Sequence, residues 1–381
     1  MFLDRALIFF AKPFGYMYLL VQHRSPLVSK FKEIAVLGYH AVTKRNRIII
    51  AYTKNHARMN IVAQNAPQKL IFVKFTQQYR ESPLLKLLLS KVDVIYQDGP
   101  NPISIETNLP RVLEFEHRYF KQELVDNHQI KKIFVMSHYA KPDLVDPEKK
   151  IEVLYPAFPT FRNTNRRKRD DKSVMIFLSG GDATRKGVDI LFNAFERVEA
   201  SLPDEYKLRL VIASNYRKHT KFYPVTEECL TRTRNAYIKS KSKKNVIFTP
   251  IYPPQLVTYF YQKADIYVLP TRYDTPSMSI FEAMSAGLPI ITTGITSIPE
   301  LVEHGNNGFL IDVKDYDLRS PEYFEYAVET VQNYLSVLIR DASLRRDMGL
   351  KSKKRMETKF SLDYKIGRLN NVFQSAATPI P

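Results

Sequence analysis

A glycine-containing segment in the middle of the chain, residues 177–187 (FLSGGDATRKG), has residue types suited to binding an anion. It lies between an apolar run that predicts a strand and a pattern that predicts a helix. Gly180 and Gly181 let the backbone turn tightly and approach a ligand closely, and the free N–H groups at the helix start would point toward an anion. Lys186 adds a positive charge, so the segment favours a diphosphate site. The alternative is an ordinary strand-to-helix turn with a solvated lysine, because the P-loop spacing is absent.

A second segment combines two carboxylates with the start of a helix. Asp274 lies in a polar loop after a predicted strand, and Glu282 lies in a helix predicted to begin near Ser279. Two carboxylates placed in this way could hold sugar hydroxyls, while the backbone amides of residues 276–279 contact phosphate or sugar oxygens. The alternative is structural: Ser279 and Glu282 have the spacing of a capping box, and Pro276 suits a helix start.

The first half of the chain contains short apolar runs separated by helix-length segments. The runs are of the kind found in strands buried on both faces of a parallel sheet, at 33–37, 47–52, 69–75, 92–96, 111–115, 132–136 and 151–155. Predicted helices include 82–90 and 118–128. This alternation predicts a doubly wound α/β domain over residues 1–161.

The same alternation restarts after a polar, charged linker at 162–172. Strands are predicted at 174–178, 208–213, 245–248, 266–269 and 289–292, and helices at 188–198, 254–263, 279–286, 323–339, 342–359 and 362–373. We therefore expect a second Rossmann-like domain over 173–345, followed by helices over 346–381 that cross back to the first domain. Two such domains would face one ligand across a cleft.

Composition narrows the classes of partner. The chain has 381 residues, a net charge of +18 and a single cysteine, Cys229. One cysteine allows no disulfide within the chain, as in a cytoplasmic protein. A basic surface attracts phosphates of any kind, but no nucleic-acid-binding module is recognisable, so no nucleic-acid partner is expected.

No metal site is expected either: no His/Cys cluster has ligand spacing, and the triplet 315–317 (DYD) is interpreted as a solvated loop.

The N-terminal residues 1–21 are rich in aromatic and apolar side chains but are interrupted by Asp4, Arg5, Lys12 and Pro13. They are too broken to span a bilayer and lack a signal-peptide cleavage pattern. We expect two short apolar helices here, which either pack on the core or lie in the interface of an anionic membrane. The second interpretation predicts peripheral membrane attachment.

Several spaced motifs of the second half resemble a known pattern. In family 4 of the retaining glycosyltransferases, which have the GT-B fold, a Glu-x7-Glu pair is followed by Ala-Met-x-x-Gly-x-Pro, then by Pro-Glu and Asn-Gly. This chain has Asp274 and Glu282 in the same frame, followed by AMSAGLP at 283–289, PE at 299–300 and NG at 307–308. Upstream, Lys186 and its following glycine are similar to the family's Lys-Gly. The resemblance covers residues 173–375 and is faint before residue 105.

The resemblance implies a metal-independent retaining glycosyltransferase with no cofactor. It would move a hexose-type sugar from a nucleotide-sugar, such as a UDP- or GDP-sugar, to a glycan or lipid-linked acceptor. The residues implied as catalytic are Lys186 on the donor diphosphate, Asp274 near the reacting carbon, and His117 facing the sugar from the first domain. A surface histidine at the end of a strand is the alternative for His117.

The donor-binding residues implied by the resemblance include backbone amides of the second helix start and Glu282, which would bind the ribose hydroxyls. The full set is Gly180, Gly181, Lys186, Ser277, Met278, Ser279 and Glu282.

The chain also departs from the family pattern. Gly181 stands where the family has an arginine, Asp274 replaces a glutamate, and Thr275 and Ser277 replace glycines. These departures keep one alternative open: a catalytically inactive GT-B-like protein that binds a nucleotide or polyanion. Arg185 is a candidate for the missing phosphate contact.

Overall fold

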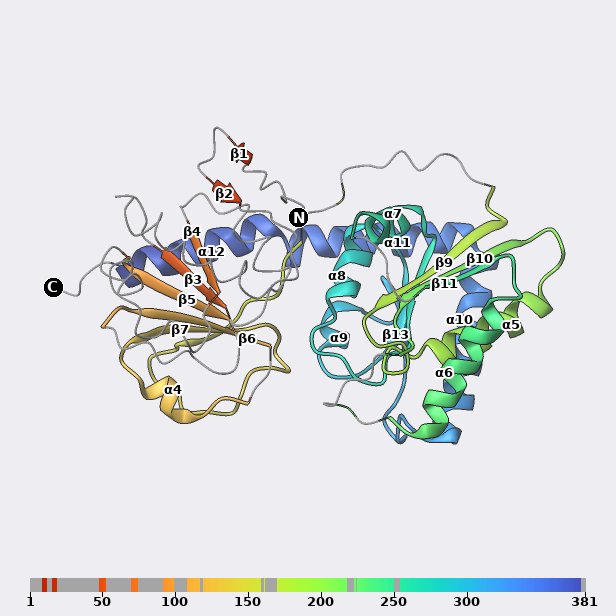
Figure 1. Ribbon diagram of the computed structural model, residues 1–381, viewed down its shortest axis with the longest axis horizontal. Helices are drawn as coiled ribbons and strands as arrows, with labels where there is room; N and C mark the ends of the chain where they lie inside the picture. The colour runs from red at the N-terminus through yellow and green to blue at the C-terminus, as the bar shows by residue number, and fades with distance from the viewer. Residues whose placement is uncertain are drawn as a thin grey trace, which may run out of the picture. The chain divides into compact units, whose positions relative to one another are not determined.

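The computed structural model describes residues 9–11, 16–18, 48–52, 70–74, 92–98, 108–116, 119–158, 161, 170–217, 223, 225–249 and 254–377. The chain forms two compact units, the first made of residues 1–155 and 363–381 and the second of residues 156–362. Each unit is built on a six-stranded parallel sheet with helices packed against it (Figure 1). The predicted class, α/β with two Rossmann-like domains, is therefore confirmed.

The first unit has the strand order β4-β3-β5-β6-β7-β8. The strands are β3 (Ile48–Tyr52), β4 (Leu70–Lys74), β5 (Val94–Asp98), β6 (Arg111–Phe115), β7 (Ile130–Val135) and β8 (Ile151–Val153), and a short helix, α4 (Gln122–Asp126), precedes β7. The described side chains of β5 and β6 are almost all buried, as expected for strands covered on both faces.

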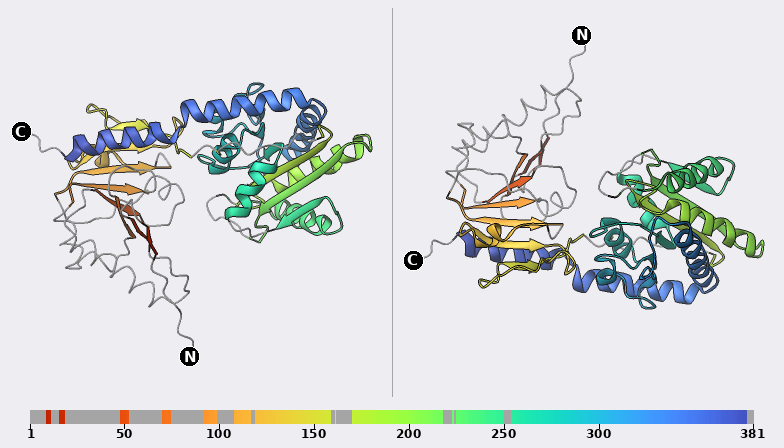
Figure 2. Two further views of the ribbon diagram at one scale, coloured as in Figure 1. Left: turned by 90° about the horizontal axis from the view of Figure 1, so that it is seen from above. Right: turned by 90° about the horizontal axis from the view of Figure 1, so that it is seen from below.

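The long C-terminal helix α12 (Leu362–Ala377) lies along this first sheet (Figure 2). Its Lys365 Nζ is 2.7 Å from Glu114 Oε1 on β6, and both side chains are buried. Arg368 makes two 2.6 Å hydrogen bonds to the carboxylate of Glu152 on β8. An unpaired charge would be costly at the depth of Lys365 and Glu114, so this ion pair specifies how α12 is placed on its sheet.

The N-terminal segment differs from its prediction. Residues Phe9–Ala11 (β1) and Tyr16–Tyr18 (β2) pair as antiparallel strands, with Phe9 opposite Tyr18. Two short helices are therefore wrong for these residues. Pro13 lies between the two runs, and proline lacks the N–H and the freedom that a continuing helix needs, while runs this short do not sustain a helix alone. The predicted strand at 33–37, the predicted helix at 82–90 and residues 162–169 of the linker lie outside the described residues.

The second unit has the strand order β11-β10-β9-β12-β13-β14. Its elements are β9 (Ser173–Gly180), α5 (Val188–Ser201), β10 (Lys207–Ser214), α6 (Glu227–Ser240), β11 (Val246–Thr249), α7 (Pro254–Lys263), β12 (Ile266–Leu269), α8 (Met278–Ser285), β13 (Ile290–Thr293), α9 (Ile298–Leu301), β14 (Gly308–Ile311), α10 (Pro321–Arg340) and α11 (Ala342–Lys359). Helices α5, α6 and α10 pack together on one face, and α8 and α11 pack together (Figure 1).

The strand order places a topological switch between β9 and β12. From β9 the chain moves outward through β10 and β11, then returns to place β12 on the other side of β9, with Ile266 beside Ile176. The connections that leave the carboxyl ends of β9 and β12 diverge, which opens a crevice where ligands bind in sheets of this kind. The loops 181–187 and 270–277 follow these two strands.

Gly187, which caps α5, allows these two loops to pack together. It has φ 72°, and a Cβ built on it would lie 2.0 Å from the carbonyl oxygen of Pro270. Any larger residue would combine a left-handed backbone with a clash against main chain.

We predict that Gly187→Ala destabilises the second unit by at least about 3 kcal/mol. Gly181→Ala is the matched control, because a Cβ at Gly181 meets nothing within 4 Å. Urea unfolding of the two variants measures the difference, and equal stabilities would contradict the packing described.

Candidate active site

Lys186 and Asp274 form an ion pair at the switch point. The Lys186 ammonium donates to Oδ2 of Asp274, 88 positions away in the sequence, and both residues are more than nine-tenths buried. Arg185 approaches the other carboxylate oxygen, with its Nη1 3.5 Å from Oδ1. The structure thus brings together two cations from the loop after β9 and one carboxylate from the loop after β12.

The pKa values of this pair follow from burial and charge. Burial lowers the pKa of Lys186, and the charge of Asp274 opposes that shift. Burial acts to raise the pKa of Asp274, but the charges of Lys186 and Arg185 outweigh it, so this pKa is lowered. The Asp274 carboxylate is therefore held ionised between two cations, and the buried Asp182 adds a second acidic charge that acts on Lys186.

The two predicted glycines play different parts. A Cβ at Gly180 would lie 2.7 Å from Cγ and 2.9 Å from Cε of Lys186, so the glycine makes room for the lysine stem to lie across the end of β9. A Cβ at Gly181 meets open space. Position 181, where the family that this chain resembles has an arginine, could therefore accommodate a side chain.

The second predicted segment forms the start of α8. Ser277 is the N-cap residue, Met278 begins the helix, and no side chain caps it. The hydroxyl oxygens of Ser277 and Ser279 lie 3.1 Å apart. The capping-box interpretation is wrong, because it needs Ser279 at the cap and Glu282 three positions later, whereas Glu282 lies five positions after the actual cap.

Glu282 lies in a less polar environment than a capping residue would. Burial raises its pKa, and a hydrogen bond with the Tyr261 hydroxyl opposes the shift. The Tyr261 hydroxyl oxygen also lies 3.2 Å from the carbonyl oxygen of Ser279 and 2.5 Å from the hydroxyl of Ser179. A half-buried carboxyl beside a buried tyrosine is an expensive arrangement to maintain for structure alone. Tyr261 was not predicted from the sequence. The one indication of its role is that its hydroxyl is a polar group within the apolar face of a helix.

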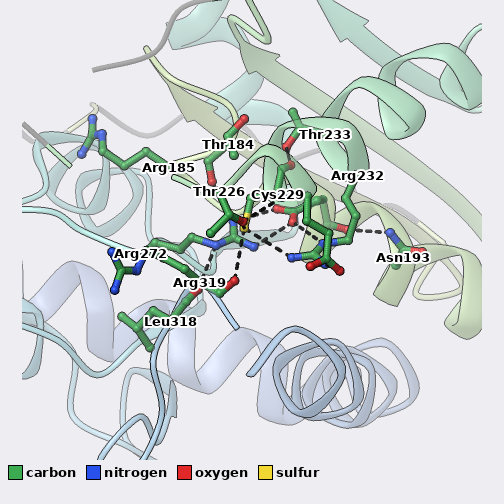
Figure 3. Close-up of polar contacts among 12 residues, drawn as sticks. Thr184, Arg185, Asn193, Thr226, Cys229, Arg232, Thr233, Arg272, Leu318 and Arg319 are labelled. Carbon is green, nitrogen blue, oxygen red and sulfur yellow. Dashed lines mark hydrogen bonds and ion pairs between the residues drawn. The ribbon is translucent and has the colours of Figure 1, made fainter. Parts of the chain in front are cut away.

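A buried arginine of the second loop, Arg272, reaches the first loop and α5 (Figure 3). Arg272 donates two hydrogen bonds to Asp189 on α5, Nη1 at 2.8 Å and Nη2 at 2.7 Å, and others to the carbonyls of Thr184 and Leu318. The backbone N–H of Arg272 donates to the backbone carbonyl of Arg185. Arg272 therefore ties the loop after β9 to the loop after β12. Sequence reasoning missed it, although an acid within the apolar pattern of α5 indicates a buried partner.

The neighbourhood of Asp189 holds a second arginine, Arg232 of α6 (Figure 3). Arg232 Nε is 3.5 Å from Asp189 Oδ2, and its guanidinium lies over the ring of Phe324. Arg232 also donates to the sulfur of Cys229, which receives a further hydrogen bond from Thr226. The one cysteine of the chain is thus buried in a structural network.

The remaining predicted features fall elsewhere. Among the described residues, no group of three or more His, Cys, Asp or Glu side chains could hold a metal ion. In the triplet 315–317, Asp317 pairs with the guanidinium of Arg319 at 2.9 Å, and both are exposed. His117 lies outside the described residues. Within the described parts of the chain, no helix has the length and apolarity to cross a membrane.

Comparison with known proteins agrees with this geometry. Residues 172–320, which contain the switch-point loops, match the family described as glycosyl transferases group 1. YtcC, a protein of Bacillus subtilis (strain 168) whose name assigns it to the glycosyltransferases, is 25% identical over 337 residues, or 80% of this chain and 77% of that protein. Residues 172–320 of the chain are a glycosyl transferases group 1 region.

Solved structures of similar fold match this chain over nearly its whole length. A glycosyltransferase from Rickettsia africae superposes with a TM-score of 0.63 at 13% identity, covering 92% of this chain and 95% of that one. HepE from Anabaena, solved in complex with UDP and glucose, superposes with a TM-score of 0.56 at 16% identity, covering 90% and 96%. These likenesses confirm the GT-B fold.

The buried Arg272–Asp189 pair gives a stability prediction. Asp189→Asn would leave Arg272 buried without its carboxylate, and losing one partner of a buried pair costs about 3–5 kcal/mol. Arg197→Ala is the control, because it removes a pair with Glu325 in which both side chains are exposed, worth about 0–1 kcal/mol. Chemical denaturation measures both, and similar small losses would show that the buried pair does not hold the loops.

The raised pKa of Glu282 gives a prediction with a definite sign. Its ionised form is less favourable in the folded than in the unfolded chain, so stability is greatest below the ordinary value of 4.5 and falls as pH rises toward the raised value. We expect Glu282→Gln to raise the free energy of unfolding at neutral pH, with the gain vanishing in acid.

The control for this measurement is Glu322→Gln. The pKa of Glu322 is lowered by hydrogen bonds from its own backbone N–H and from Ser320, so this variant should lose stability at neutral pH. Thermal unfolding over a pH series tests both signs, and a neutral-pH loss for Glu282→Gln would contradict the assignment.

Proposed function

We propose that this glycosyltransferase takes a hexose-type sugar from a UDP- or GDP-sugar and transfers it with retention and without a metal ion. The supporting observation is the buried Lys186–Asp274 pair, with Arg185 beside it, at the topological switch point. Two cationic side chains on one loop there suit a diphosphate. HepE, a structural neighbour, was solved with UDP-glucose, which agrees with a nucleotide-sugar as donor.

The leaving group determines the chemistry that the site must supply. As the bond from the anomeric carbon to the diphosphate oxygen breaks, its electron pair passes to the diphosphate, which gains negative charge. Lys186, Arg185 and the backbone amides of residues 277–279 would stabilise that charge in place of a metal ion. Because Lys186 is paired with Asp274 in the present structure, donor binding would shift the ammonium toward the phosphates.

Asp274 and Glu282 would contact the two ends of the donor. The Asp274 carboxylate, held ionised by its neighbours, would hold the hydroxyls of the transferred sugar and offset the positive charge that develops on the anomeric carbon. Glu282, which lies in the second turn of α8, would accept hydrogen bonds from the ribose hydroxyls. His117 is proposed to face the sugar from the first unit.

The acceptor is proposed to be a glycan or a lipid-linked glycan. The basic character of the chain, +18 overall, favours an acceptor at an anionic membrane surface, with the protein attached peripherally on the cytoplasmic side.

One observation also favours the inactive alternative. Gly181 leaves open space where the resembling family has an arginine, so this chain lacks one cation that would contact phosphate. A nucleotide-binding protein without turnover would need fewer such contacts.

We predict that Lys186→Ala abolishes sugar transfer and nucleotide release while the protein stays folded. The leaving diphosphate would lose its nearest cation, a loss of about 100-fold or more in rate. Incubation with UDP-, GDP- and ADP-sugars, followed by assay of free nucleotide, measures the effect.

Lys314→Ala, at an exposed position of the same unit, is the control and should retain the wild-type rate. Wild-type turnover by Lys186→Ala would disprove the role of the lysine. Tight nucleotide binding by the wild-type protein with no turnover on any donor would favour the inactive alternative.

A further inference from the structure

A third loop reaches the carboxylate-bearing loop from the neighbouring strand. It comprises residues 294–297 (GITS) between β13 and α9. Strand β13 pairs with β12 in the sheet, Thr292 lying beside Leu269, so the loops that follow the two strands are neighbours. The half-buried Thr296 of this third loop donates a hydrogen bond from its hydroxyl to the backbone carbonyl of Asp274.

Thr296 makes this contact from a strained backbone. Its φ is 49°, and among the described residues Lys149, at 51°, is the one other non-glycine residue with a positive φ. A β-branched side chain in the left-handed region crowds its own backbone, which is why glycine or asparagine ordinarily occupies such positions. Retaining a threonine there therefore costs stability and needs a compensating interaction.

The compensating interaction is the hydrogen bond to Asp274. The two carboxylate oxygens of Asp274 are held by Lys186 and Arg185 from one side, and its carbonyl is held by Thr296 from the other. The hydrogen bond from Thr296 thus holds the backbone of Asp274 in place independently of the two cations. This matters because the cations would turn toward a bound diphosphate and loosen their hold on the acid.

We propose that Thr296 is a positioning residue, whose hydroxyl keeps the Asp274 carboxylate in register with the transferred sugar when the donor draws Lys186 away. This role rests on the proposed function. Strain retained beside a functional group, where a glycine would be more stable, is the pattern expected of such a residue. Thr296 would act through Asp274 and would not itself touch the reacting atoms.

Three variants at one position separate the hydroxyl from the strain. Thr296→Val keeps the shape and the strain but removes the donor, Thr296→Ser keeps the donor, and Thr296→Gly removes both donor and strain. We expect kcat for transfer to fall about ten-fold in the valine and glycine variants, with the KM for the donor within about two-fold, because the diphosphate and ribose contacts remain. Thr296→Ser should retain kcat within about two-fold.

Stability should move differently from activity. Thr296→Gly should melt at or above the wild-type temperature while losing activity, because strain relief offsets the lost hydrogen bond. Lys149→Gly is the matched control, because Lys149 lies in the first unit and has a similar positive φ. This variant should raise the melting temperature by roughly 2–4 °C with no change in kcat. Wild-type kcat in both the valine and glycine variants, or equal losses in the serine and valine variants, would overturn the proposal.

Amide hydrogen exchange over residues 272–277 keeps this test separate from that of the proposed function. Exchange should be faster in Thr296→Val than in Thr296→Ser and wild type, whether or not the protein turns over a donor. If the wild-type protein transfers no sugar but the exchange pattern holds, the proposed function fails while the tether remains. Unchanged exchange in Thr296→Val with normal wild-type turnover would refute the tether alone.

Discussion

Buried charge at the switch point is the constraint on which the second unit depends. Lys186 and Asp274 lose most of their hydration, and such groups are tolerated only when a partner and hydrogen bonds replace the lost water. The loops after β9 and β12 must therefore meet in one geometry. The close approach of Gly187 to Pro270 and the bonds of Arg272 to Asp189 and to the loop carbonyls enforce that geometry from below.

The same constraint makes the site suited to an anionic ligand. Two carboxylates of this region, Asp274 and Asp189, each have two cations within ion-pair distance: Lys186 and Arg185 at the first, Arg272 and Arg232 at the second. The deeper pair serves the fold, because Arg272 is sealed from solvent. In the upper cluster, Lys186 and Arg185 are the cations that a diphosphate could engage. Stability and ligand binding thus draw on the same type of interaction at two depths.

The first unit uses a similar device for a different purpose. Lys365 on α12 pairs with the buried Glu114 of β6, and the Tyr96 hydroxyl donates to the same carboxylate. The ring of Phe373 packs against Tyr96, with centroids 5.3 Å apart. These contacts combine apolar burial with one specific charge pair, so the last helix of the chain has a single register on a sheet formed by residues far earlier in the sequence.

Local chemistry explains where prediction from sequence was reliable. The runs at 111–115 and 266–269 are β6 and β12 without change of bounds, because each is short, mainly apolar, and bounded by a proline on one side and an acidic residue on the other. Helix α7 (Pro254–Lys263) likewise begins at its proline, as predicted. The errors arose where local signals compete: Ser277 took the cap position expected of Ser279, and the aromatic N-terminal runs pair as strands.

The sequence by itself determined the α/β class, the two-domain organisation of the fold and the two loops that carry Lys186 and Asp274, since periodicity, glycine placement and motif spacing are local properties of the chain. Tertiary structure alone decided that these residues share an ion pair, that Arg272 supports them through Asp189, and that Thr296 reaches Asp274 from a third loop. The physical reason is that such contacts join residues 22 to 88 positions apart. Strand order and the cost of burying charge determine which residues make these contacts, and neither can be inferred from one segment of the sequence alone.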